Sequence, residues 1–288
     1  MNFTKSEAIL RIHCEDKPGI IAAVTQYVLE HGGNIIDLDQ HTDSEKRKFY
    51  MRVSWELENF DLKPEEIGAS FEQKLANSLE LNWSLNFSHK PPRIALFVSK
   101  QQHCLFDIIG RWQTKEWEVE IPLIISNHED ARDVAEKFGI NFYHFPITKE
   151  NKAEQETAQL ALLKENDIDL IVLARYMQIL SGNFIDEFRN KIINIHHSFL
   201  PAFPGARPYH SAYERGVKII GATSHYVTED LDEGPIIEQD IVHVTHRDDV
   251  KSLVRKGRDL ETLVLSRAVW KHIQRKTLVT SNRTIIFN

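Results

Sequence analysis

The chain has 288 residues, of which 42% are hydrophobic and 27% are charged, as is typical of a globular protein with about two domains. Its 35 basic and 42 acidic residues give a net charge of −7, and no long basic block offsets it, so a general nucleic-acid or membrane-surface binder is not expected. Two distant cysteines, Cys14 and Cys104, exclude a disulfide framework and disfavour a cysteine zinc site. The first residues lack the apolar core of a signal peptide and no apolar run is long enough to span a membrane, so we expect a cytoplasmic protein.

Residues 1–87 predict a small first domain. Alternating apolar residues predict four strands, at 7–13, 35–42, 47–55 and 81–87. Apolar residues on one helical face predict two helices, the second of them opening at Pro64. Asp16 is expected to cap the first helix, Pro18 to lie in its first turn, and Gly32-Gly33 to end it. The order βαββαβ predicts a ferredoxin-like layer of one sheet and two helices.

The turns at the two ends of the first helix carry a family resemblance. Asp16-Lys17-Pro18-Gly19 and Gly32-Gly33-Asn34 resemble the ACT family of amino-acid-binding regulatory domains. The resemblance implies a small amino acid, glycine or methionine, held between the two turns by Asp16, Gly19, Gly33 and Asn34. Alternatively, the glycines only form turns. Because two helices cover only one face of the sheet, we also expect the other face to pair copies into an even-numbered homo-oligomer.

Residues 88–92 read Ser-His-Lys-Pro-Pro and predict a linker, because consecutive prolines neither continue a helix nor pair in a central strand. Residues 93–288 then predict a Rossmann-like α/β domain, in which apolar strands alternate with helices. The strands expected in its parallel sheet lie at 94–98, 119–125, 170–173 and 192–195. Two more, expected to extend the sheet antiparallel, lie at 219–227 and 235–244.

Two further elements are expected near the end of the chain. A long helix is predicted to start near Asp248 or Asp249, because apolar residues recur on one helical face through residues 250–264. Residues 283–287 are expected to form a terminal strand.

Polar residues gather where two strands of the second domain end. Asn194 and His196 stand two residues apart, which in a strand places both side chains on one face. Asp232 precedes Gly234-Pro235, whose turn would fold the carboxylate back over the site. An amide, an imidazole and a carboxylate suit proton transfer and oxyanion stabilisation at a carbonyl. Any one of these residues alone would more commonly be structural, but together they favour a catalytic site.

Two more histidines belong to the same segments. His197 and His225 are expected to be structural or to support the site from behind. A metal held by His196, His197, His225 and Asp232 is a weaker alternative, because adjacent residues of an extended chain, such as His196 and His197, would point to opposite sides.

The motifs of the second domain resemble the folate-dependent formyltransferase family over residues 93–275. The resemblance rests on Asn194-x-His196, Leu200-Pro201, Phe203-x-Gly205 and Asp232-x-Gly-Pro. It places the family's catalytic asparagine, histidine and aspartate on Asn194, His196 and Asp232. It also implies a folate-binding set made of Tyr176, Met177, Gln178, Ile179, Leu180 and Val227. Backbone groups there would bind the pterin and Leu180 would pack on it, although Met177 and Leu180 also suit a core.

One departure bears on the activity. The amine-formylating members carry a glycine-rich phosphate loop after the first strand, whereas residues 99–109 contain no glycine. The resemblance is therefore to the deformylase members, in which water replaces the amine. It implies hydrolysis of 10-formyltetrahydrofolate to tetrahydrofolate and formate, feeding purine synthesis and one-carbon balance, without metal or cofactor.

The resemblance also implies a role for each catalytic residue. Asp232 would hold the water, help deprotonate it and favour the His196 cation, while Asn194 and protonated His196 would stabilise the oxyanion. Three alternatives stay open: transfer to an unidentified amine, metal-dependent hydrolysis, and a non-catalytic folate or amino-acid sensor.

Overall fold

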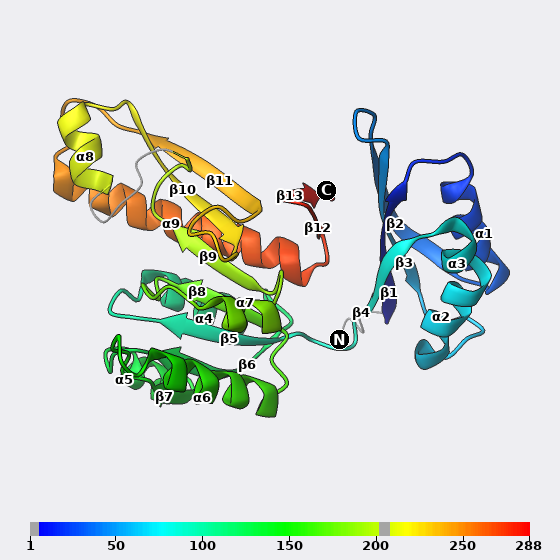
Figure 1. The fold of residues 1–288 in the computed structure, drawn as a ribbon, viewed down its shortest axis with the longest axis horizontal. Helices are drawn as coiled ribbons and strands as arrows, with labels where there is room; N and C mark the ends of the chain where they lie inside the picture. The colour runs from blue at the N-terminus through cyan, green and yellow to red at the C-terminus, as the bar shows by residue number, and fades with distance from the viewer. Residues whose placement is uncertain (1–5, 202–207) are drawn as a thin grey trace. The chain divides into compact units, whose positions relative to one another are not determined.

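The computed structural model describes residues 6–201 and 208–288, which fold into two compact units (Figure 1). The first unit contains Met1–Pro91 together with Arg275–Leu278 and Ile285–Asn288. The second contains Pro92–Gln274 and Val279–Thr284, whereas the sequence places all of residues 93–288 in one domain. Within the described part of the chain, no helix combines the length and the apolar character needed to cross a membrane.

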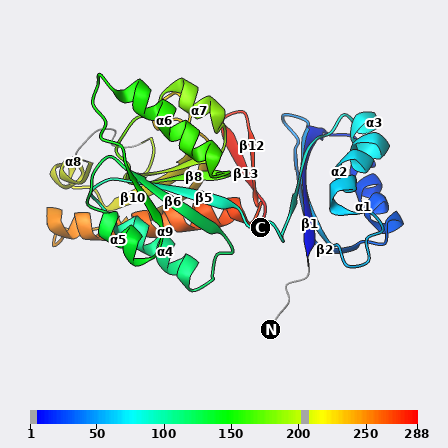
Figure 2. The ribbon, with the colours of Figure 1, turned by 90° about the horizontal axis from the view of Figure 1, so that it is seen from below.

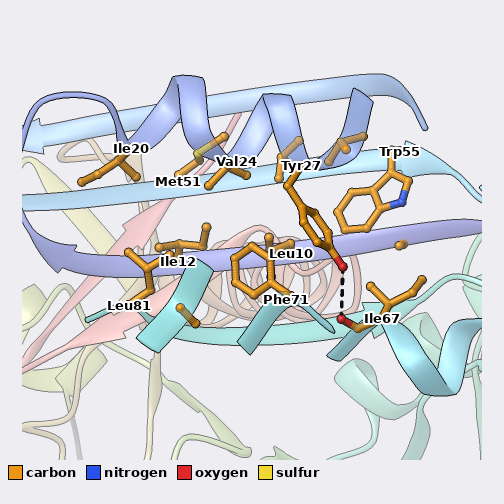
Figure 3. Close-up of a cluster of buried hydrophobic side chains, with 14 of the residues drawn as sticks. Leu10, Ile12, Ile20, Val24, Tyr27, Met51, Trp55, Ile67, Phe71 and Leu81 are labelled. Atoms are coloured by element: carbon orange, nitrogen blue, oxygen red, sulfur yellow. Dashed lines mark hydrogen bonds between the residues drawn. The ribbon is translucent and has the colours of Figure 1, made fainter. Parts of the chain in front are cut away.

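The first unit confirms the predicted βαββαβ order. Its elements are β1 (Glu7–Glu15), α1 (Ile20–Glu30), β2 (Asn34–Asp43), β3 (Lys48–Glu56), α2 (Pro64–Phe71), η1 (Glu72–Ala76), α3 (Asn77–Leu79) and β4 (Asn82–Phe87). The described strands form an antiparallel sheet in the order β2-β3-β1-β4. One face of β1 and β3 packs against the helices, and Figure 3 shows Val24 and Tyr27 of α1 and Phe71 of α2 in this core. The Tyr27 hydroxyl donates to the Ile67 carbonyl at 3.4 Å.

The start of α1 differs from the expectation. The residue before the helix is Gly19 in a left-handed conformation, with φ of 92°, and no side chain caps the helix. The backbone N–H of Asp16 instead donates a hydrogen bond to the Arg47 carbonyl at 2.9 Å. The prediction that Asp16 caps α1 and that Pro18 lies in its first turn was therefore wrong, because Gly19 turns the chain after both residues. A glycine suits this position, since side chains with a Cβ disfavour positive φ.

The sheet face opposite the helices is partly covered by the end of the same chain. Tyr50 of β3 packs with Leu278 and Phe287, and it is 2% exposed. The Arg11 guanidinium donates to the Thr277 carbonyl at 2.7 Å. The oligomer was predicted on the assumption that this face lies open, and that assumption was wrong at β3. The oligomer itself stays a prediction.

The second unit is a sheet with helices on both faces. Its elements are β5 (Arg93–Val98), α4 (His103–Gln113), β6 (Glu120–Ser126), α5 (Arg132–Lys137), β7 (Asn141–His144), α6 (Lys152–Glu165), β8 (Leu170–Ala174), α7 (Gly182–Glu187), β9 (Ile192–His196), α8 (Pro208–Arg215), β10 (Ile219–Tyr226), β11 (Ile236–His243) and α9 (Val250–Ile273). The described strands run in the order β11-β10-β9-β8-β5-β6-β7, with β10 and β11 antiparallel to their neighbours, as predicted. Figure 2 shows α6 and α7 on one face and α4, α5 and α9 on the other.

Two finer expectations concern the end of the chain, and one strand was not expected. The Asp249 carboxylate accepts from the Ser252 N–H at 2.7 Å, which confirms one of the two predicted starts of the long helix α9. The chain closes with the hairpin β12 (Thr277–Thr280) and β13 (Arg283–Ile286), which confirms the terminal strand. Sequence analysis missed β7, because four residues at a sheet edge, only partly buried, carry too short an apolar pattern.

Candidate active site

The site lies where β9 and β10 meet a loop that follows β10. Asn194 and His196 are alternate residues of β9, so their side chains share a face, as predicted. β10 runs antiparallel beside β9 and places His225 opposite Asn194. Asp232 follows in the loop that joins β10 to β11. The pairing therefore brings together residues that are 38 positions apart in sequence, from 194 to 232.

Gly234 explains how the loop between β10 and β11 comes close to the end of β10. A Cβ at Gly234 would overlap the Tyr226 carbonyl oxygen, so the backbone approaches the end of β10 only because position 234 has no side chain. The Tyr226 N–H donates to the Pro235 carbonyl at 2.9 Å and holds this approach. Asp232 itself is left-handed, with φ of 59°. The tight return of the loop thus turns the carboxylate toward β9.

Asp232 lies between two imidazoles. Its Oδ2 is 3.1 Å from His196 Nδ1, and its Oδ1 is 3.6 Å from His225 Nε2. The hydrogen bond from His196 holds the pKa of Asp232 well below its usual value, against a partial burial that would raise it. The carboxylate is therefore ionised throughout the neutral range.

Asn194 is positioned by His225. Its Nδ2 lies 3.2 Å from His225 Nε2, while His225 Nδ1 lies 2.9 Å from the Tyr226 carbonyl. Because a carbonyl only accepts, Nδ1 carries the proton, and in the neutral ring Nε2 accepts from the Asn194 amide. The second amide hydrogen of Asn194 is then available to a substrate. His225 thus contacts Asn194 as a supporting residue would, and its role in the site stays a prediction.

His196 presents one unused atom. Its Nδ1 faces Asp232, whereas its Nε2 is buried without a hydrogen-bond partner among residues 6–201 and 208–288. Buried polar atoms are usually paired, so this nitrogen is a candidate for a hydrogen bond to a ligand.

His197 departs from its predicted direction. The rings of His196 and His197 stack, with centroids 5.0 Å apart and planes inclined by 29°. The expectation that they face opposite sides was wrong, because His196 is the last residue of β9 and strand alternation ends there. Burial, followed by the charge of Arg175, lowers the pKa of His197 to about 4, so its ring is neutral beside His196.

A pocket opens beside the three residues. It is lined by Leu173, Gln178, Ile179, Leu180, Ile185, Asn194, His225, Val227, Thr228, Glu229, Leu231 and Asp232. Four of the predicted folate contacts, namely Gln178, Ile179, Leu180 and Val227, therefore line it. Ile179 and Leu231 are 59% and 61% exposed, so apolar surface surrounds the pocket. A flat aromatic ligand would cover such surface.

Two other predicted folate contacts do not line this pocket. Tyr176 is 1% exposed, packs edge-on against Phe97 and accepts from Gln159 at 3.2 Å, so its side chain belongs to the core. Met177 is 62% exposed, which also contradicts the alternative of core packing. Left-handed backbones at Arg175 and Met177 interrupt the strand alternation and turn neighbouring side chains in and out.

Sequence analysis did not assign several pocket residues. Leu173 and Ile185 fit ordinary core positions, and Thr228, Glu229 and Leu231 lie in the loop between β10 and β11 without a motif of their own. Only the Gly-Pro turn after Asp232 signalled that this loop would fold back. The predicted motif residues Phe203 and Gly205 lie outside the described residues.

One possible metal-ligand group occurs among the described residues, and it lies away from the pocket. It consists of His103, Cys104 and Glu261. Burial raises the pKa of the Cys104 thiol far above its usual value, and the Arg175 guanidinium lies 3.5 Å from the Glu261 carboxylate. A protonated thiol and a neighbouring cation both oppose metal binding, so this group fits a hydrogen-bond cluster better than a metal centre.

The two turns of the first unit do not meet in one chain. They lie at opposite ends of α1, whose eleven residues span about 16 Å. The Gly33 N–H already donates to the Val28 carbonyl at 2.8 Å, and a Cβ on Gly33 would collide with the Val28 side chain. The prediction that one small amino acid lies between both turns of a chain was therefore wrong. Asn34 Nδ2 lies 3.4 Å from Glu56 Oε2, while no side chain in the described part of the protein caps the N-terminus of α1.

Comparison with known proteins agrees with this architecture. A family model described as formyl transferase matches residues 92–269, and one described as ACT domain matches residues 8–67. A formyltetrahydrofolate deformylase from Synechocystis sp. is 58% identical over 280 residues, covering 97% of this chain and 98% of the relative. The solved structure of a formyltetrahydrofolate deformylase from Pseudomonas syringae pv. tomato has a TM-score of 0.97 at 40% identity, covering 100% of this chain and 96% of that one.

A more distant similarity concerns the second unit. The solved glycinamide ribonucleotide transformylase 1 of Symbiobacterium toebii has a TM-score of 0.65 at 29% identity, covering 71% of this chain and 98% of that one.

Proposed function

Because the chain belongs to the formyltetrahydrofolate deformylase family, we propose that it hydrolyses 10-formyltetrahydrofolate to tetrahydrofolate and formate with Asn194, His196 and Asp232. The observation that carries the assignment of residues is the unpaired Nε2 of His196, next to the apolar pocket and fixed from behind by Asp232. The reaction adds water across a formamide C–N bond: the C–O bond of formate forms, the C–N10 bond breaks, and N10 gains a proton.

His196 and Asn194 stabilise the charge that develops on the formyl oxygen. In the protonated ring, Nδ1–H donates to Asp232 and Nε2–H donates to the oxyanion of the tetrahedral intermediate. The free amide hydrogen of Asn194 supplies a second donor. Preorganised donors of this kind stabilise the transition state more than the ground state. When the intermediate collapses, His196 is placed to give its proton to N10.

Asp232 acts on the attacking water. Its carboxylate is ionised and partly exposed, so a water molecule can donate to it while approaching the formyl carbon. A carboxylate whose pKa is held low is a weak base, so Asp232 first orients the water. Asp232 takes the proton of the water when His196 gives its own proton to N10 and becomes neutral.

The folate occupies the pocket beside these groups. Leu180 and Val227 supply apolar walls, and Gln178 supplies polar atoms for the edge of the pterin. Tyr176 and Met177 contribute through their backbone, because the Tyr176 side chain lies in the core and that of Met177 faces outward.

Formate release from 10-formyltetrahydrofolate alone tests the function. The purified chain is incubated without any amine, and formate and tetrahydrofolate are quantified together. We expect equal amounts of both products. The proposed chemistry uses side chains and water, so EDTA is expected to leave the rate unchanged. A requirement for an amine would instead indicate a transferase, and loss of activity in EDTA would indicate a metal enzyme.

We further propose that the first unit regulates the second by binding a small amino acid such as glycine or methionine, and that the chain forms a homo-oligomer. The uncapped N–H groups at the start of α1 suit its carboxylate, and Asp16 suits its ammonium. Calorimetric titration of wild type, Asp16→Ala and the neighbouring control Glu15→Ala tests this, with light scattering for mass. Equal binding by all three proteins would contradict the assignment of Asp16.

A further inference from the structure

A second polar cluster lies at the carboxyl ends of β5 and β8. Glu261 of α9 accepts from the Tyr209 hydroxyl at 2.7 Å and from His103 Nε2 at 2.8 Å. Its carboxylate also lies 3.5 Å from Arg175 Nε. His103 opens α4, Tyr209 lies on α8 and Arg175 directly follows β8. The cluster therefore joins four segments at one edge of the sheet.

The cluster is closed to solvent at its centre. Glu261 is 1% exposed and Arg175 is 8% exposed. Burial opposes the ionisation of Glu261, but the hydrogen bond from His103 and the charge of Arg175 hold its pKa below the usual value. The carboxylate of Glu261 and the guanidinium of Arg175 therefore form a buried charge pair at the ends of β5 and β8.

This place is one where a ligand would be expected. The chain runs from β5 to β6 and β7 on one side and returns to β8 on the other, so the strand order reverses between β5 and β8. Open α/β sheets usually bind ligands at such a switch point. The solved transformylase that this chain resembles is named for glycinamide ribonucleotide. In this chain, the carboxyl ends of β5 and β8 hold the protein's own side chains.

Two rings connect this cluster to the catalytic imidazole. His197 stacks on His196, and the His197 and Tyr209 ring centroids lie 6.2 Å apart. A Cβ on Gly257 would overlap the Tyr209 hydroxyl, so the glycine allows Tyr209 to lie against α9 and reach Glu261 one turn later. A glycine within a helix lowers helix stability, and the close contact with Tyr209 explains why a glycine stands at position 257.

We propose that the rings of His197 and Tyr209 keep amines away from the formyl carbon and leave water as the nucleophile. Glu261 fixes Tyr209, and we call the two rings the acceptor wall. This inference rests on the proposed hydrolysis and names the residues that set its specificity. An admitted amine would form a new N–C bond to the formyl carbon, the C–N10 bond would break, and the proton of the amine would pass to N10. Exclusion depends on the volume of the two rings, because the amine and water differ in size.

The test compares product ratios in wild type, Tyr209→Ala and His197→Ala, with glycinamide as the amine. Tyr213→Ala is the matched control, because Tyr213 lies on the same helix and is 51% exposed. We expect wild type and Tyr213→Ala to release formate with at most a trace of formylglycinamide. The two wall variants should raise the ratio of formylglycinamide to formate by roughly tenfold or more, as a missing steric contact commonly does. Tyr209→Phe should stay hydrolytic, since it keeps the ring.

Thermal melting checks that each variant is folded, and Tyr209→Val replaces Tyr209→Ala if the latter is not. Folded wall variants that release formate but make no formylglycinamide would overturn the inference. Folded variants that lose both products would also overturn it, because the rings would then serve catalysis and not exclusion. Failure of the proposed function is distinguishable, since it appears as absent formate release in wild type without amine.

Discussion

The two polar clusters at the carboxyl edge of the larger sheet both centre on a carboxylate held by a histidine. Around Asp232 the walls are apolar, and the facing imidazole keeps one buried nitrogen unpaired. Around Glu261 both carboxylate oxygens accept hydrogen bonds, and the nearest cation, Arg175, is itself buried. The same residue types therefore occur in an open arrangement and in a closed one.

The difference shows how a catalytic cluster is told from a structural one. Asp232 has 25% of its side chain exposed, so it is able to contact a ligand, whereas Glu261 has 1%. A reacting group needs an unmet hydrogen bond and access to substrate, while a buried charge needs internal partners. Loss of Asp232 should therefore affect rate, and loss of Glu261 should affect stability.

The largest expected effect is on catalysis at the open cluster. Asp232→Asn and His196→Ala should each lower kcat by about a thousandfold or more, because the proposed mechanism assigns water orientation, proton transfer and oxyanion stabilisation to this pair. Formate release and thermal melting are measured together. Asp230→Asn, an exposed neighbour in the same loop, is the control and should retain full activity. A fall in melting temperature large enough to explain the lost rate would make the pair structural.

The closed cluster should respond in stability instead. Glu261→Gln leaves Arg175 buried without its counter-charge and should lower the free energy of unfolding by about 3–5 kcal/mol. Asp186→Asn, which removes an exposed ion pair with Arg189, should change it by about 1 kcal/mol or less. Urea unfolding followed by tryptophan fluorescence measures both. Equal midpoints for the two variants would contradict the contrast between the clusters.

Asn194 should show an intermediate effect at the open cluster. Asn194→Ala removes one oxyanion donor and should lower kcat by about 10²–10³ with little change in KM. Asn141→Ala, at an exposed position of β7, is the control. Steady-state kinetics of formate release separate the two constants. A rise in KM at constant kcat would show that Asn194 binds the ground state and not the oxyanion.

The smallest expected effect is the pH dependence of stability at Asp232. Since its folded pKa is lowered, the carboxylate contributes stability above the unfolded pKa of about 3.9 and loses it as the pH falls through the folded value. The melting temperature of wild type minus that of Asp232→Asn should therefore be largest above about pH 5, where the carboxylate is ionised in the folded and the unfolded state. It should shrink progressively below about pH 4. A difference that stays constant down to pH 3 would contradict the lowered pKa.

Local patterns in the sequence were enough to predict much of the fold. The βαββαβ order of the first unit and the strands at 94–98 and 192–195 follow from apolar alternation and turn residues, which depend on neighbours only a few positions apart. Asn194-x-His196 was readable for the same reason, since a strand places alternate residues on one face.

Tertiary structure decided everything that depends on pairing between distant segments. His225 orients Asn194 only because β10 lies antiparallel beside β9, and the Glu261 cluster needs four segments to meet. The direction of side chains that follow the end of a strand was also not predicted correctly. Tyr176 turned into the core, because left-handed backbones flank it, and His197 stacked on His196 beyond the last residue of β9. Periodicity specifies a direction only inside a regular element, so these residues took theirs from packing.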